Sequence, residues 1–188
     1  YSLGGTMTGI ILALLLVPLF SALLVFSIPN TRKELFRPIG IVFSLITFTQ
    51  SMYILFSDYS KSDFQILFRF EWIQVYGLEI NLGISGMSTL LLLLSSLLVL
   101  LSLLSIGKDH SESKGFIGSI LTLHFAINGV FISGDLISLF IFFEALLIPM
   151  YFLMGIWGGD NRRYATIKFI LYTVFGSIFI FIGNVYTA

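Results

Sequence analysis

The run LISLFIFFEALLIPMYFLMGIW, residues 136–157, decides the fold of this chain. It carries one charged side chain, Glu144, close to its middle. A helix needs roughly 20 apolar residues to cross about 30 Å of hydrocarbon, so this run predicts a membrane-spanning helix. An ionisable group at such a depth is costly to bury and marks a functional site by default.

The composition of the whole chain predicts the same environment. Its 188 residues are 57% hydrophobic and 11% charged, and the mean hydropathy of +1.00 lies far from that of a soluble domain. We therefore expect an all-α membrane protein, a single-domain bundle of about six transmembrane helices. The six predicted spans are about 7–28, 38–57, 87–106, 116–133, 136–157 and 164–186.

The basic residues predict an orientation. Short loops that stay on the inner side of a membrane carry an excess of Lys and Arg. With the N-terminus outside, Lys61 and Arg69 fall on the outer side and all other basic residues near loops fall on the inner side. That inner set is Arg32, Lys33, Arg37, Lys108, Lys114, Arg162 and Arg163, with Lys168 just inside the following helix.

Cysteine is absent, and this excludes a disulfide framework, thiolate metal sites and cysteine-ligated iron–sulfur clusters. Two histidines leave little for haem. We expect no cofactor in this chain, no metal site and no nucleic-acid partner.

One extramembrane segment, about 58–86, is long enough to have structure. Apolar residues alternate with polar ones at Phe68, Phe70 and Trp72 and again at Leu78, Ile80 and Leu82, with Tyr76 and Gly77 between the two runs. This pattern predicts a short β-hairpin between the second and third spans. We expect its apolar side to be covered by a helix or another subunit; the alternative is an interfacial loop without a partner.

The strongest candidate site is Glu144 with Pro149. A proline has no amide hydrogen and clashes with the carbonyl four residues earlier, here that of Ala145, so the helix is expected to bend beside the carboxyl. The freed carbonyl and the carboxyl together suggest a small polar cavity and a proton that is loaded and released there. The alternatives are an ordinary packing kink and a carboxyl that only pins two helices together.

Three further polar residues are candidates. His124 is expected at a depth similar to that of Glu144, where it relays protons or stays neutral and hydrogen-bonded, and Asn128 shares its helix face. Asp135 is expected to cap the fifth span. Lys168 either extends its ammonium to the inner interface or points into the bundle.

Two stretches carry a family resemblance. Residues 134–151, GDLISLFIFFEALLIPMY, followed by GIWGG at 155–159, resemble the fifth-helix signature of NADH-ubiquinone oxidoreductase chain 4. Residues 163–169, RYATIKF, with LYT at 171–173 and Gly176-Ser177, resemble the sixth helix of that subunit. The Leu-Ile-Pro-Met after the glutamate is typical of chain 4 rather than its sister chains 2 and 5.

The resemblance implies an antiporter-like, non-redox subunit of respiratory complex I, which couples quinone reduction to proton pumping. It implies that Glu144 pairs with a lysine on the helix after the sixth. Because family members have about fourteen spans, it also implies that this chain is an N-terminal part. NAD, FMN, iron–sulfur clusters and ubiquinone are expected in other subunits. The implied partners are the rest of chain 4, chains 2 and 5, other membrane-arm subunits and membrane lipids.

Two other functions remain open: a subunit of a multi-subunit cation/proton antiporter, and a structural scaffold. The abundance of Phe, Ile and Ser favours a mitochondrial inner membrane, with the N-terminus on the intermembrane-space side, over a bacterial plasma membrane.

Overall fold

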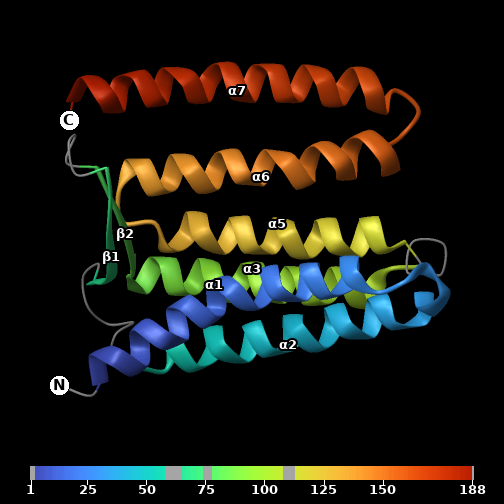
Figure 1. The fold of residues 1–188 in the computed structure, drawn as a ribbon, viewed down its shortest axis with the longest axis horizontal. Coiled ribbons are helices and arrows are strands. Elements are labelled where there is room, and N and C mark those ends of the chain that lie inside the picture. The colour runs from blue at the N-terminus through green and yellow to red at the C-terminus, as the bar shows by residue number, and fades with distance from the viewer. Residues whose placement is uncertain (1–2, 58–64, 74–77, 108–112, 188) are drawn as a thin grey trace.

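The computed structural model describes residues 3–57, 65–73, 78–107 and 113–187. In these ranges the chain is a bundle of helices that lie side by side, with a two-stranded hairpin across one end (Figure 1). The elements in chain order are α1 Leu3–Ser27, the 3-10 helix η1 Asn30–Leu35, α2 Phe36–Leu55, β1 Gln65–Ile73, β2 Leu78–Ile84, α3 Gly86–Ser105, α5 Lys114–Ile132, α6 Leu136–Trp157 and α7 Arg162–Thr187.

The predicted class, an all-α membrane protein with one small hairpin, is confirmed. Five helical stretches among the described residues are long and apolar enough to cross a membrane. They are Thr8–Ser27, Asn30–Leu55, Gly86–Ser105, Lys114–Ile132 and Leu136–Trp157. The helix α7 covers the sixth predicted span, and its crossing of the membrane stays a prediction.

The hairpin closes one end of the bundle, as the alternating pattern predicts. Its strands are antiparallel, with Phe68 opposite Leu82 and Phe70 opposite Ile80. Leu82 and Ile84 are buried in a core cluster that also contains residues of α1, α3 and α5, so helices of the same chain cover this part of the hairpin, whereas Phe70 is exposed. The predicted turn at Tyr76 and Gly77 lies outside the described residues.

The first helix contains a proline, and a distant side chain compensates for it. Pro18 lies inside α1 and has no amide hydrogen, so the carbonyl of Leu14 lacks its helical donor. The side-chain amide of Asn128, on α5, donates to this carbonyl oxygen at 3.2 Å. Ser95, in α3, also lies within hydrogen-bond distance of Asn128, with its Oγ 3.3 Å from Asn128 Oδ1. One buried amide therefore joins α1, α3 and α5.

This arrangement predicts a coupling between Pro18 and Asn128. Replacing Asn128→Ala should lower the free energy of unfolding in mixed micelles by about 1 kcal/mol, since the Leu14 carbonyl loses its partner. In a Pro18→Ala background, residue 18 supplies the missing N–H, so the same Asn128→Ala change should have a smaller effect. Equal losses in the two backgrounds would show that Asn128 does not compensate for the proline.

Candidate functional site

The helix that carries the candidate carboxyl is defined by its two ends. Asp135 is the N-cap of α6, and its Oδ1 accepts from the backbone N–H of Ser138 at 2.7 Å. At the other end Gly158 is the C-cap, with its N–H bonded to the Met154 carbonyl. Between these ends α6 stays one helix through Pro149, which is buried.

Asp135 also joins α6 to the hairpin. Its Oδ2 accepts from the backbone N–H of Asn81, in β2, at 2.7 Å and from the hydroxyl of Ser138 at the same distance. In return, the Asn81 carbonyl accepts from the N–H of Gly134 at 2.7 Å. The cap expected from the sequence therefore has a second role, because it holds the start of α6 against β2.

Glu144 lies near the middle of α6, is partly buried and faces α7. Its Oε1 accepts a hydrogen bond from the hydroxyl of Ser177, which is 2% exposed. Figure 1 shows α6 between α5 and α7, so the carboxyl is directed away from α5. Among the residues that the structure describes, Glu144 has no ion-pair partner.

A groove of about 530 Å³ between α6 and α7 opens beside Glu144. Apart from the carboxyl its lining is apolar or aromatic, and it includes Ile148, Tyr151 and Val174. The sequence predicts a polar cavity here, and that prediction is wrong, because the groove has no polar side chain in its lining apart from the Glu144 carboxyl and the Tyr151 hydroxyl. The outer face of α7 beyond the groove is strongly exposed, as at Leu171 and Phe175.

The structure does not bring His124 to Glu144. His124 is fully buried in α5, and neither ring nitrogen has a hydrogen-bond partner among the described residues. It is one helical turn from Asn128, which is bonded towards α1 and α3, whereas Glu144 is bonded to α7. A direct relay between His124 and Glu144 is therefore not formed in this structure.

Lys168 is also far from the carboxyl. It is exposed near the start of α7, with its Nζ 5.7 Å from the centroid of the Tyr164 ring. Nine residues separate it from Ser177, which corresponds to about 13 Å along a helix axis. Lys168 therefore has the place expected of a lysine that extends towards the interface.

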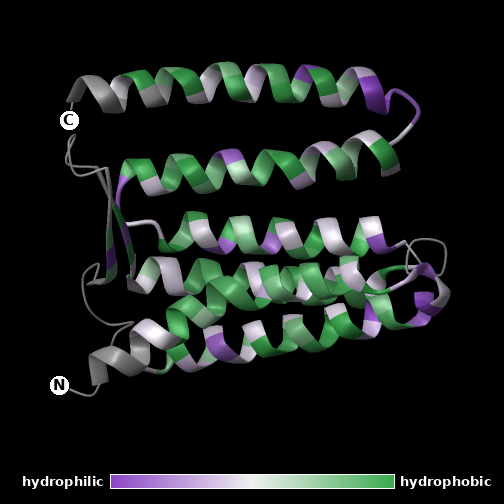
Figure 2. Cartoon of the chain, viewed as in Figure 1, coloured by the Kyte–Doolittle hydropathy of each residue, from purple (hydrophilic) through white to green (hydrophobic). Residues whose placement is uncertain are grey.

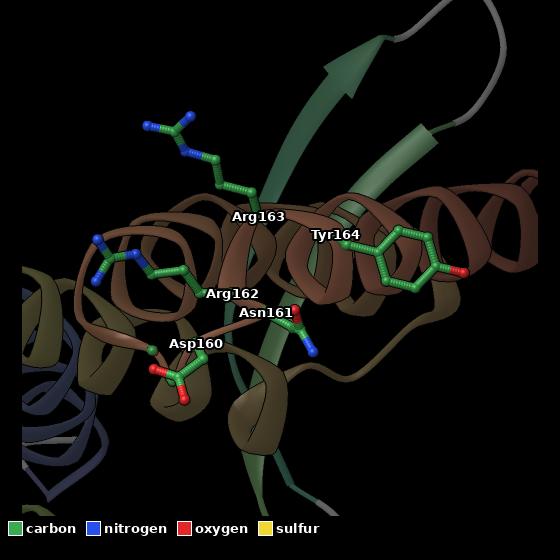
Figure 3. A pocket seen from close by; sticks show the side chains of 7 residues that line it. Asp160, Asn161, Arg162, Arg163 and Tyr164 are labelled. Atoms are coloured by element: carbon green, nitrogen blue, oxygen red, sulfur yellow. The ribbon is translucent and has the colours of Figure 1, made fainter.

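The polar end of the bundle lies opposite the hairpin. Figure 2 shows hydrophilic colour at η1 and at the link between α6 and α7, the end that also contains Arg37 and Lys114. A hollow of about 480 Å³ lies at this link, lined by residues 158–164. In Figure 3 the side chains of Arg162 and Arg163 extend to the same side of the view with their guanidinium groups well apart, so they do not converge on one point.

Sequence reasoning missed Ser177 as a site residue. The residue was visible as part of the Gly176-Ser177 pair, but its helix gave no sign of which face meets α6. Within the described ranges no group of three or more His, Cys, Asp or Glu side chains is placed to hold a metal ion. The polar chemistry around the carboxyl is therefore that of Glu144 and Ser177.

Comparison with known proteins assigns this site to a family. Residues 133–187, which include Glu144 and Ser177, match the transmembrane family described as NADH:quinone oxidoreductase/Mrp antiporter. NADH-quinone oxidoreductase subunit M of Rickettsia conorii is 35% identical over 177 residues, which cover 90% of this chain and 36% of that protein. NAD(P)H-quinone oxidoreductase chain 4 2 of Trichodesmium erythraeum is 37% identical over 172 residues, covering 90% and 31%.

A solved structure is also similar to this chain. A chain of respiratory complex I from Thermus thermophilus with bound NADH superimposes with a TM-score of 0.73 at 28% identity, covering 89% of this chain and 33% of that one. Residues 133–187 belong to this transmembrane family, and most of the chain is similar to NADH-quinone oxidoreductase subunit M and chain 4. It spans about a third of the length of the curated relatives that it matches. The predicted resemblance to chain 4 is confirmed, because relatives named subunit M and chain 4 match along most of this antiporter-like chain.

The double role of Asp135 is testable. Asp135→Ala removes the α6 cap and the acceptor for Asn81, and we expect it to lower the free energy of unfolding by about 1 to 2 kcal/mol. Asp135→Asn keeps one acceptor oxygen and should lose less. Thermal unfolding of the two variants in detergent measures the difference. An unchanged stability of Asp135→Ala would show that the tie between β2 and α6 is unimportant.

Proposed function

We propose that this chain is the N-terminal part of a proton-translocating, antiporter-like subunit in the membrane arm of an NADH:quinone oxidoreductase. Glu144 is its central ionisable group. The observation that carries the proposal is a carboxyl in the middle of an apolar helix, inside the family-matched region, that has a hydroxyl partner and no cation among the described residues. Such a group is costly to keep in hydrocarbon, and for this reason it marks a functional site by default.

The open groove supports a role for the rest of the subunit. Glu144 lines a groove whose other walls are apolar, and the exposed face of α7 lies beyond it. We propose that a lysine from the remaining part of the subunit reaches the carboxyl from this side. A nearby ammonium favours the ionised carboxylate, and its withdrawal favours protonation. Movement of that charge would then drive Glu144 to release or take up a proton.

The cofactors and partners follow from this assignment. The oxidation of NADH and the reduction of quinone, with NAD, FMN, iron–sulfur clusters and ubiquinone, belong to other subunits of the complex. The direct partners are the rest of chain 4, the sister chains 2 and 5, and membrane lipids. His124, buried without a hydrogen-bond partner in the described structure, is a secondary candidate for proton exchange.

A second function rests on the description of the matched family, which includes Mrp antiporters. In that case the same carboxyl would exchange protons against a metal cation, with no link to quinone. Sensitivity of transport to a quinone-site inhibitor separates the two functions. A purely structural role would leave transport complete when Glu144 and His124 are both neutralised.

Glu144→Gln tests the proposed role. We expect the variant complex to assemble and to pump roughly tenfold fewer protons per NADH oxidised, since the amide cannot release a proton. Pumping is measured by the quenching of a pH-sensitive dye in membrane vesicles, and assembly by native gel electrophoresis. Asp160→Asn is the matched control, because it makes the same chemical change at an exposed residue outside the apolar run. Normal pumping by an assembled Glu144→Gln complex would refute the proposal.

The orientation is a separate proposal. We place the basic end, with η1, in the matrix or cytoplasm and the hairpin on the opposite side of a mitochondrial inner or bacterial plasma membrane. These 188 residues contain no cysteine, so Thr31→Cys in η1 and Phe70→Cys in β1, both at exposed residues, each introduce a single cysteine into this chain, and labelling is read from this chain after it is separated from the other subunits. An impermeant maleimide added from the outer side should label Phe70→Cys alone. Outer-side labelling of Thr31→Cys instead would reverse the orientation.

A further inference from the structure

Ser177 is one of two buried residues among the described side chains of α7. The other is Thr166, eleven residues earlier, and this spacing returns a helix to nearly the same face. Both residues therefore lie on the face of α7 that packs on α6. Neighbours of Ser177 such as Ile178 and Phe179 are exposed. The hydroxyl of Ser177 is thus the polar group that α7 brings to Glu144.

The Ser177 hydroxyl has two acceptors and one proton to give. Its Oγ lies within hydrogen-bond distance of Glu144 Oε1 and 2.9 Å from the carbonyl oxygen of Val174, one turn earlier in α7. A serine hydroxyl carries a single donor and can also accept. The hydroxyl can therefore donate to the carboxylate or to the Val174 carbonyl, but not to both at the same time.

The protonation state of Glu144 selects between these two bonds. An ionised carboxylate is an acceptor only, so Ser177 donates to it. A protonated carboxyl has a hydrogen of its own to donate, and Ser177 Oγ accepts it while its own hydrogen turns to the Val174 carbonyl. The Glu144 carboxyl and the Ser177 hydroxyl are hydrogen-bonded to each other in both protonation states. Only the direction of this hydrogen bond between α6 and α7 reverses.

We propose that Ser177 is a positioning residue for proton exchange at Glu144: its hydroxyl holds the carboxyl against α7 in both protonation states and reverses its hydrogen bond as the proton enters or leaves. This inference rests on the proposed function of Glu144 and adds the group that keeps that carboxyl satisfied away from water. An unsatisfied polar group in hydrocarbon is strongly unfavourable, so a carboxyl that changes charge needs a partner able both to donate and to accept.

The groove beside Glu144 supplies few other side chains that could hydrogen-bond to the carboxyl. The groove on the open side of Glu144 is apolar except for the tyrosine at 151, which is itself about half exposed. Val174 belongs to this groove lining and also supplies the second acceptor of Ser177. A proton that reaches Glu144 therefore meets a carboxyl of which one oxygen, Oε1, is already hydrogen-bonded to Ser177.

The test compares three α7 variants in the complete enzyme complex in its native membrane. Ser177→Ala removes the hydroxyl. Ser177→Thr keeps it. Thr173→Ala, one turn earlier, removes a hydroxyl that bonds only to the Phe169 carbonyl of its own helix, and it serves as the matched control. Proton pumping per NADH oxidised and the infrared carbonyl band of protonated Glu144, identified by its loss in Glu144→Gln, are measured for each.

We expect Ser177→Ala to lower pumping on the order of three- to tenfold, as for the loss of one buried hydrogen bond, and to move the Glu144 band. Ser177→Thr and Thr173→Ala should leave both near wild type. If Ser177→Ala does not assemble, Ser177→Cys, whose thiol is a weak donor, should give the same band movement with a smaller loss of pumping.

The outcomes separate this inference from the proposed function. A loss of pumping in Glu144→Gln together with an unmoved band and normal pumping in Ser177→Ala would overturn the role of Ser177 and leave that of Glu144 intact. Normal pumping in Glu144→Gln would refute the proposed function, and the infrared band would then still decide whether Ser177 holds the carboxyl. Loss of function in Thr173→Ala equal to that in Ser177→Ala would overturn the positioning role.

Discussion

The structure depends on the inability of hydrocarbon to form hydrogen bonds. A polar group placed deep in the bundle is strongly disfavoured unless the protein supplies a partner. Asn128 meets the carbonyl that Pro18 leaves open, and Ser177 meets Glu144. In both cases the partner comes from a different helix. The apolar surfaces make the chain a membrane protein, and these polar pairs favour one rotation of α5 against α1 and of α6 against α7.

The helices and the hairpin could be predicted because length and alternation alone determine them. The predicted span 136–157 coincides with α6, and the predicted span 87–106 differs by one residue at each end from α3. The cap at Asp135 was also predictable, because a carboxylate before an apolar run fits the exposed amides of a first helical turn. These features need only local information, and local information is what a sequence shows most directly.

The rotation of the helices could not be predicted in the same way. The helix α6 is apolar on nearly all sides, so no stripe of polar residues indicates which neighbouring helix Glu144 faces. The sequence predicts only that His124 and Glu144 lie at a similar depth, and depth does not distinguish a side chain directed at α5 from one directed at α7. The sequence placed His124 and Asn128 on one helix face. The direction of that face towards α1 and α3 follows from the Leu14 carbonyl, which lies 114 residues from Asn128 in the sequence and which Pro18 leaves without a helical donor. Ser177 was missed for the same reason.

The bond between Asn128 and Leu14 has a consequence for biogenesis. A chain made from its N-terminus inserts α1 long before the ribosome reaches residue 128, so the Leu14 carbonyl first enters the bilayer without its donor. Until α5 arrives, water or the insertion machinery has to shield that oxygen. The early helices therefore gain this hydrogen bond only when α5 joins them, so the final packing of α1 is coupled to a helix that is made much later.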